Sequence, residues 1–220
     1  MTHFSDGVRA GRNFANNGTA SQPGVYMSPI NVYDIVPAAL VTNGICAQQT
    51  LAAAGNATLN GSLASGGVAT LDVPRNVIID AAGAATAVLT ITGTDVYGIP
   101  MSEAITLNGT TAVAGKKAFK TITRVAASAA ATDFFVGTGD VFGLPIRANS
   151  RNYVQTAWNS AFVTTGTFVV ADATAATTTT GDVRGTFAPA DAADATKRLT
   201  LWVFIADDDT QTGLYGVTQA

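Results

Sequence analysis

The chain contains few of the side chains that carry most enzyme chemistry. Its 220 residues include one histidine, His3, and one glutamate, Glu103, and only 12% of them are charged. Nucleophilic catalysis of the Ser-His-Asp or Cys-His type needs an imidazole beside the nucleophile, yet His3 lies in an N-terminal segment without hydrophobic periodicity. Glu103 lies within a predicted strand, and most aspartates, such as Asp95, Asp140 and Asp182, occupy predicted turns, where they cap backbone amides. We therefore expect neither an enzyme nor a cofactor.

The same scarcity limits disulfide and metal chemistry. A single cysteine, Cys46, excludes an internal disulfide and a cysteine-based zinc site, and we expect it to be a small buried residue. Asp207, Asp208 and Asp209 form the one acidic run, but they lack the ligand spacing and the loop glycine of an EF-hand. We expect an acidic turn there and no metal site.

Three glycines come close to a nucleotide-binding motif without matching it. Gly137, Gly139 and Gly143 approach the dinucleotide-binding fingerprint, but the last spacing is one residue too long and Pro145 follows where a helix should begin. We predict a turn-rich β corner in this stretch.

Charge and hydropathy also argue against nucleic acid and membrane partners. The net charge is −3 and the sequence pI is about 4.9, so the chain has no overall basic field for phosphates. Residues 1–7 lack the basic region and apolar stretch of a signal peptide, and no later run is long enough to span a bilayer. We expect a protein that is made in the cytoplasm and contacts other proteins.

The residues that are abundant favour strands and tight turns. Hydrophobic residues make up 47% of the chain, 22 residues are glycine, and threonine, serine, asparagine and alanine are frequent. The clearest unit is a predicted hairpin, in which residues 88–92 and 102–107 alternate apolar and polar side chains around a turn at residues 95–98. A third strand should follow at residues 117–125, although its apolar residues are spaced by three rather than by two.

Further strands are predicted along the rest of the chain. Pro74 separates two of them, and the strand at 198–205 is apolar on both faces, as expected for a central strand or one covered by another subunit. The low-complexity stretch 173–180 is predicted to be an exposed loop or hairpin tip, and 190–196 a short helix or a turn. The remaining predicted strands are 32–37, 68–73, 76–80, 134–136, 153–158, 161–163 and 167–171.

This pattern predicts an all-β fold, an antiparallel β-sandwich of Ig-like or jelly-roll-like type with an extended N-terminal arm. Residues 1–30 form the predicted arm and residues 31–148 the sandwich. Residues 149–220 form a C-terminal β region, which is either a second small domain or a continuation of the sandwich.

Six residues are candidates for contacts with a partner. The arm could order against a partner, although a terminus without any partner is an equally good interpretation. The two tryptophans are interpreted as core or subunit-contact residues, with sugar stacking as the alternative. The candidates are Phe4, Arg9, Arg12, Phe14, Trp158 and Trp202.

Residues 89–109 carry the most specific similarity to a known family. They follow, loosely, the pattern T-I-T-G-T-D-x-x-G-x-x-x-x-E-x-I-x-L-N-G, which resembles virion structural proteins of tailed bacteriophages. Further similar blocks lie at 117–125, 136–145, 181–189 and 214–217. None of these blocks is a catalytic motif.

The resemblance implies a particle component, most like a capsid decoration or cement protein. Such a protein lies on the exterior of the capsid, is assembled in the host cytoplasm, and has the major capsid protein and copies of itself, often as trimers, as partners. A tail, neck or baseplate protein is the first alternative. A carbohydrate-binding host-recognition module is the second, and an enzyme such as a glycosidase comes last because carboxylates are so few.

Overall fold

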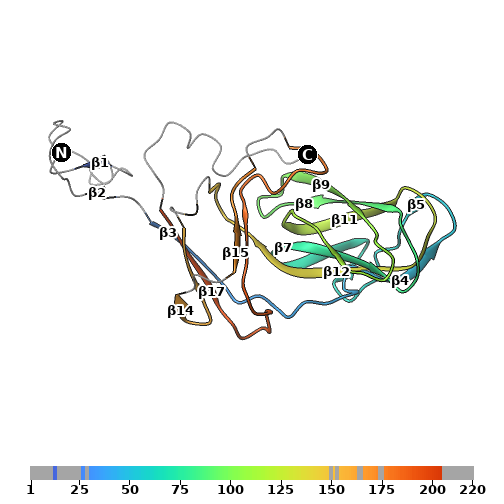
Figure 1. Cartoon of the computed structure of the whole chain (residues 1–220), viewed down its shortest axis with the longest axis horizontal. Coiled ribbons are helices and arrows are strands. Elements are labelled where there is room, and N and C mark those ends of the chain that lie inside the picture. The colour runs from blue at the N-terminus through green and yellow to red at the C-terminus, as the bar shows by residue number, and fades with distance from the viewer. Residues whose placement is uncertain are drawn as a thin grey trace.

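The chain forms an all-β structure in which every strand pairing is antiparallel (Figure 1). The computed structural model describes residues 12–13, 26–27, 30–148, 151, 154–162, 166–172 and 176–204, and these residues contain no α-helix. The strands fall into a large curled sheet, a four-stranded sheet and a two-stranded pair. The predicted fold class, an antiparallel β-sandwich, is confirmed, with the large sheet curled into a half-barrel.

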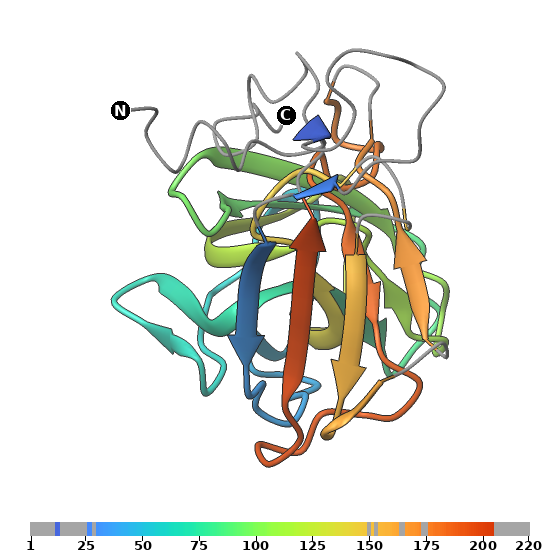
Figure 2. The same cartoon turned by 90° about the vertical axis from the view of Figure 1, so that its left-hand side faces the viewer.

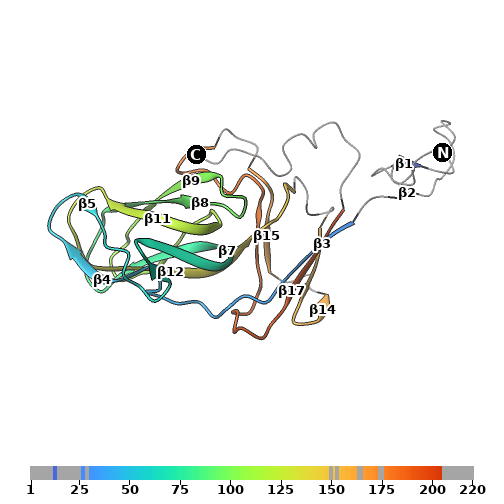
Figure 3. The same cartoon turned by 180° about the vertical axis from the view of Figure 1, so that it is seen from behind.

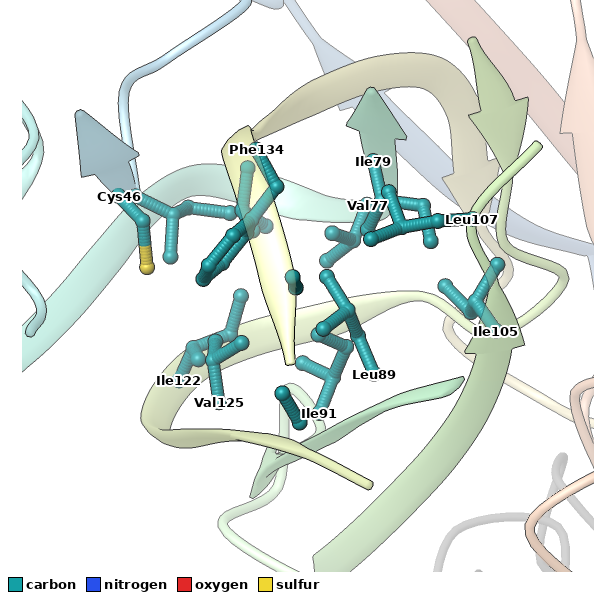
Figure 4. Close-up of a cluster of buried hydrophobic side chains, with 14 of the residues drawn as sticks. Cys46, Val77, Ile79, Leu89, Ile91, Ile105, Leu107, Ile122, Val125 and Phe134 are labelled. Atoms are coloured by element: carbon teal, nitrogen blue, oxygen red, sulfur yellow. The ribbon is translucent and has the colours of Figure 1, made fainter. Parts of the chain in front are cut away.

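The large sheet has eleven strands and encloses the main core. Its central path runs β15-β16-β12-β7-β11-β8-β9, and the short strands β4, β5, β6 and β10 pair along its sides. Figure 4 shows the aliphatic and aromatic side chains that these strands direct toward one another. The strand bounds are β4 Cys46–Leu51, β5 Gly55–Asn56, β6 Ala64–Ser65, β7 Val68–Ala81, β8 Val88–Thr94, β9 Pro100–Thr106, β10 Val113–Ala114, β11 Phe119–Ala127, β12 Ala131–Gly143, β15 Thr167–Val169 and β16 Thr186–Ala188.

The predicted hairpin is present as β8 and β9. The two strands pair from Val88 opposite Thr106 to Thr94 opposite Pro100, and side chains alternate between buried and partly exposed along both. In the turn, the Gly98 amide donates to the Asp95 carbonyl over 3.2 Å, and Gly98 has a φ of 78°. This positive φ suits glycine, so local sequence alone places the turn.

The irregular spacing in β11 has a structural cause. Phe119, Ile122 and Val125 are all fully buried although they are three residues apart. The register of β11 shifts between Phe119 and Thr121 against β7, and between Ile122 and Arg124 against β8. The shift against β8 adds one residue to β11, as a β-bulge does, and so returns Val125 to the core face. The shift against β7 has its extra residues in β7, between Arg75 and Thr70.

Two sequence predictions about strand ends are wrong. Pro74 does not separate two strands, because β7 continues through it from Val68 to Ala81. The proline interrupts the ladder rather than the strand: Thr70, on one side, pairs with β11, whereas residues 77–81, on the other, pair with β12.

The predicted glycine-rich corner is also a strand, since β12 runs on through Gly143. The glycines are needed for close approach instead of turning. A Cβ on Gly137 would lie 2.1 Å from the Val41 carbonyl oxygen, and one on Gly139 would lie 2.3 Å from Oδ1 of Asn76.

The four-stranded sheet joins the two ends of the described chain. Its order is β14-β13-β17-β3, with β3 Ile30–Ile35, β13 Val154–Trp158, β14 Ala161–Phe162 and β17 Leu199–Phe204. Figures 1 and 3 show it at one end of the molecule, beside the curled body. Strand β17 is central, which is one of the two positions that its apolar faces predicted.

The sheets do not follow the predicted division of the chain. Strand β3 was placed with the sandwich of residues 31–148 but pairs with β17, while β15 and β16 return from the C-terminal region to the large sheet. The chain therefore crosses between the sheets four times, and a second core of apolar residues fills the space between them.

A buried arginine links the large sheet to the connection between β3 and β4. Arg75 is 1% exposed, and its guanidinium lies 5.3 Å from the centre of the Phe142 ring. Its Nε donates to the Gly139 carbonyl over 2.6 Å, its Nη2 to Asp140 over 2.5 Å, and its Nη1 to the Ala38 carbonyl over 2.9 Å. Because Ala38 belongs to the connection between β3 and β4, Arg75 ties both sheets together.

Two segments outside the strands are irregular where the structure describes them. The sequence predicts residues 173–180 to be a loop or hairpin tip and residues 190–196 to be a short helix or a turn. The stretch 176–180 is partly exposed, and the Thr178 carbonyl accepts the Ala104 amide over 2.8 Å, so this loop covers the open edge of β9. Residues 190–196 form bends rather than a helix. There the Thr196 and Lys197 amides bind Asp194, and these bonds lower the pKa of its carboxyl to about 2.

Candidate interaction surface

The outer face of the four-stranded sheet is the candidate functional surface. We use the term outer face for the side chains of Val32, Asp34, Gln155, Phe162, Thr200 and Trp202, which by strand alternation point away from the second core. Figure 2 shows this sheet from the side that faces away from the large body.

A tight hairpin brings Phe162 onto the outer face. Asn159 and Ser160 form the two-residue turn between β13 and β14, with φ of 51° and 66°. Two successive positive φ values are typical of a type I′ turn, whose twist matches that of paired strands. The turn sets Phe162 opposite Ala157 in the register.

Two aromatic rings form the centre of the face. The ring centres of Phe162 and Trp202 lie 5.4 Å apart at an angle of 38°. Ala157 lies on the same face but is only 6% exposed, because the two larger side chains flank it. Phe162 itself remains 73% exposed and Val32 60% exposed. Apolar side chains this exposed on a regular sheet make this face a candidate contact surface.

A polar border lies along the β17 and β3 side of the aromatic pair. Arg198 donates to Oδ2 of Asp34, and Thr200 donates to Oδ1 of Asp34 over 3.1 Å. Both charged side chains are about half exposed, so this ion pair contributes little to stability. It makes this border of the face polar.

The inner face of the same sheet is packed. Leu199, Leu201 and Val203 are at most 2% exposed, and Trp158 is 4% exposed and stacks on Phe142 with ring centres 6.4 Å apart. The candidate contact residue Trp158 is therefore a core residue, and its indole N–H has no hydrogen-bond partner among the described residues. The candidate Trp202 lies on the outer face and is partly exposed.

The arm candidates are mostly outside the described residues. This applies to Phe4, Arg9 and Phe14, and also to His3. Arg12 lies in β1 (Arg12–Asn13), whose backbone pairs antiparallel with β2 (Tyr26–Met27). The contacts proposed for the arm stay a prediction.

The buried carboxylates serve the fold. Both oxygens of Glu103 accept backbone amides, from Lys116 over 2.5 Å and from Lys117 over 3.2 Å. Asp182 likewise accepts the amides of Ala118 and Arg184. Burial raises the pKa of Glu103 and lowers the pKa of the Lys117 ammonium, in each case because the charged form loses water. Carboxylates held by backbone amides act as caps, as predicted for Asp182.

These caps lie where four blocks singled out in the sequence analysis meet. Arg184 donates to Asp95 over 2.6 Å, and both side chains are at most 3% exposed. The Tyr97 hydroxyl donates to the Pro145 carbonyl over 2.5 Å, and the Leu144 amide donates to the Gly185 carbonyl. Four blocks that are separate in sequence, 89–109, 117–125, 136–145 and 181–189, thus form one network. These blocks therefore contact one another in the folded chain.

No protein-family model, curated protein or solved structure matches this chain. The interpretation of the surface therefore depends on its own residues.

Other chemistry is sparse in the part of the chain that the structure describes. Within it, no three histidine, cysteine, aspartate or glutamate side chains are grouped to hold a metal ion. Cys46 is fully buried, as predicted, and burial raises the pKa of its thiol to about 12. Among the described residues there is also no helix long and apolar enough to cross a membrane.

Sequence reasoning missed Phe162 and Val32 as surface residues. Both were assigned to strands, but neither was singled out. The available signal was the strand at 198–205, whose two apolar faces indicated that one face meets something besides the core. Applying the same alternation to its neighbours would have placed Phe162 and Val32 beside Trp202.

Proposed function

We propose that this chain is a non-enzymatic structural protein of a tailed-phage particle, namely a decoration or cement protein on the exterior of the major capsid shell. The observation that carries the proposal is the outer face, where a packed inner side supports the exposed Phe162 and Val32 and the partly exposed Trp202. Such a surface is suited to protein contact. The sequence blocks that resemble virion proteins of tailed phages are the reason for proposing a phage particle.

The proposed mechanism is additive contact. The four-stranded sheet presents a small surface, so a single contact is weak. On a shell with many equivalent positions, each further contact forms at high effective concentration, and several weak contacts together give strong attachment. A cement protein built in this way stabilises the shell without any single tight site.

Copy number in the native particle tests the proposal. We expect this chain in hundreds of copies, in fixed ratio to the major capsid protein, and density for the β body on the outside of the shell. Quantitative mass spectrometry and imaging of purified particles measure both. A few copies at the neck or baseplate would refute the cement role and favour the tail alternative.

The arm gives a second test of attachment. Deleting residues 1–22 removes Phe4, Arg9, Arg12 and Phe14, and we expect lower occupancy on purified capsids. Unchanged occupancy would remove the arm from the proposal while leaving the outer face in it.

A carbohydrate-binding role is the second candidate. It is favoured by one observation, the partly exposed Trp202 near the exposed Gln155 and the partly exposed Thr200, since sugars stack on an aromatic ring while polar neighbours bind their hydroxyls. Glycan-array binding that Trp202→Ala abolishes would support it. Absence of binding across the array would exclude it.

A further inference from the structure

We infer that residues 30–37, which are β3 and the two residues after it, form a releasable strap. The strap peels from β17 when the two ends of the chain are pulled apart, and its release stops at Ala38, which is bonded to the large sheet. The inference goes beyond the proposed function, because it concerns how the fold responds to tension. It is a property of the isolated protein, so it can be tested without capsids and can fail while the proposed function stands.

The register of β3 and β17 determines how tension from the chain ends reaches them. The chain enters β3 at Ile30 and leaves β17 at Phe204, and these two residues are paired. The opposite end of the ladder pairs Ile35 with Leu199. A force that separates the chain ends therefore acts on one terminal pair and opens the pairs one after another. A single backbone hydrogen bond contributes little net free energy, so each step needs little force.

Strand β3 is held less firmly than the strand beside it. It lies at the edge of the four-stranded sheet and has β17 as its one partner among the described strands, whereas β17 is paired on both sides. No side chain from Val32 to Val36 is fully buried, whereas the three inner-face residues of β17 are at most 2% exposed. Segments with few buried apolar contacts open at a lower free energy than the core. We therefore expect β3 to leave the sheet while β17 stays paired with β13.

The chain just beyond the strap is anchored to the large sheet at both its amides and its carbonyls. The Ala38 amide donates to Oδ2 of Asp72 over 2.6 Å, and the Ala38 carbonyl accepts from Nη1 of Arg75 over 2.9 Å. The Val41 amide donates to Oγ1 of Thr138, and the Thr138 amide donates to the Val41 carbonyl, each over 3.0 Å. These partners lie in β7 and β12, which are neighbouring central strands of the large sheet. We therefore expect the peeling to end at Ala38.

Single-molecule stretching of the full chain between two alternative pairs of handles tests the direction of release. One handle is attached at the N-terminus, and the other either at a cysteine added after Ala220 or at Lys197→Cys, both in a Cys46→Ala background. The C-terminal handle opens the β3–β17 ladder pair by pair. Lys197 precedes the start of β17, so its handle pulls the two strands past each other and strains all six pairs at once. We expect a rupture force several times lower with the C-terminal handle. The β1–β2 pair is stretched in both arrangements, so it does not affect the comparison.

The length of chain freed in the first release tests the stop. In the wild type it should correspond to residues 30–37, roughly 27 Å of extended chain, with the large sheet still folded. Arg75→Met and Asp72→Ala each remove one bond to Ala38, so the release should run past Ala38 in both. Arg124→Met, on the exposed side of β11, is the matched control and should leave the release unchanged.

Three results would overturn the inference. The first is an equal rupture force for the two handle positions, which would mean that the register of β3 and β17 does not govern the release. The second is a wild-type first release that already includes the large sheet. The third is a first release of the same length in the wild type and in both anchor variants, which would mean that the bonds to Ala38 do not stop it. Circular dichroism confirms that each variant is folded before it is stretched.

Discussion

The large sheet and the four-stranded sheet use their faces differently. The large sheet curls around its own core, so Leu89 and Ile91 of β8 and Phe134 of β12 are all fully buried. The four-stranded sheet buries one face against the large body and leaves Phe162 and Val32 exposed on the other. The first arrangement satisfies the needs of folding alone. The second keeps apolar surface that folding does not use, which is why we place function there.

Replacing one phenylalanine in each region should show which ring stabilises the fold and which ring is free to contact another molecule. Phe134→Ala removes a fully buried ring from the main core and should lower the free energy of unfolding by about 4 kcal/mol. Phe162→Ala, at 73% exposure, should change it by less than about 0.5 kcal/mol. Urea unfolding measures both values. Similar losses for the two variants would show that the outer face is part of the core.

The connection between the regions can be broken at Arg75. Arg75→Met leaves Asp140 and the Gly139 and Ala38 carbonyls without their donor, and should cost about 3 kcal/mol, the low end for a broken buried pair, because Asp72 and Asp140 keep some solvent. Arg124→Met, on the exposed side of β11, is the control and should cost less than about 0.5 kcal/mol.

The same variant tests how the two regions cooperate. Both tryptophans, Trp158 and Trp202, lie in the four-stranded sheet, so their fluorescence reports that sheet, whereas far-ultraviolet circular dichroism reports all strands. We expect the two urea transitions to coincide in the wild type and to separate in Arg75→Met. Coincident transitions in the variant would mean that the second core alone couples the sheets.

The two regions also differ in how much of them sequence predicts. The β8–β9 hairpin could be predicted because its signals are local. These are the alternation of apolar and polar residues with period two, and a turn in which Gly98 has a positive φ. The pairing of β3 with β17 could not be predicted from the sequence, since it joins Asp34 to Thr200, which are 166 positions apart. Long-range pairing determines which residues share a face, and local pattern does not encode it.

The misassigned positions are those where one local signal has two physical meanings. Glycine marks turns, but in β12 Gly137 and Gly139 allow close approach to Val41 and Asn76, residues far away in sequence. Proline ends strands, but Pro74 lies where β7 exchanges one partner strand for another. The outer face was only partly predicted for the same reason. Trp202 was a candidate by residue type, whereas Phe162 becomes one only through its neighbours.

The burial of Cys46 inside the large sheet predicts that the free energy of unfolding depends on pH. Burial raises the pKa of its thiol to about 12, above the value for an exposed thiol, so the folded state holds this proton more tightly. The resulting stabilisation is fully present below about pH 8.5 and is lost as pH rises toward 12. Between pH 8 and 10 the wild type should lose about 1.9 kcal/mol more than Cys46→Ala does. Parallel stability curves for the two proteins would contradict a sealed thiol.

The smallest predicted effect lies in the hairpin that carries Phe162. Ser160 has a φ of 66°, a conformation that costs a residue with a Cβ about 1 kcal/mol and costs glycine almost nothing. Ser160→Gly should therefore raise the free energy of unfolding by about 0.5 kcal/mol, even though glycine loses more backbone entropy on folding. Ser65→Gly, in strand β6, should lower it by about 0.5 kcal/mol, so the same substitution has opposite signs in the two regions. Urea midpoints at equal slope measure both. Because Ser160→Gly leaves Phe162 in place, it should not weaken the contact made by the outer face; a weakened contact would mean that the strained turn, and not the aromatic pair alone, positions that surface.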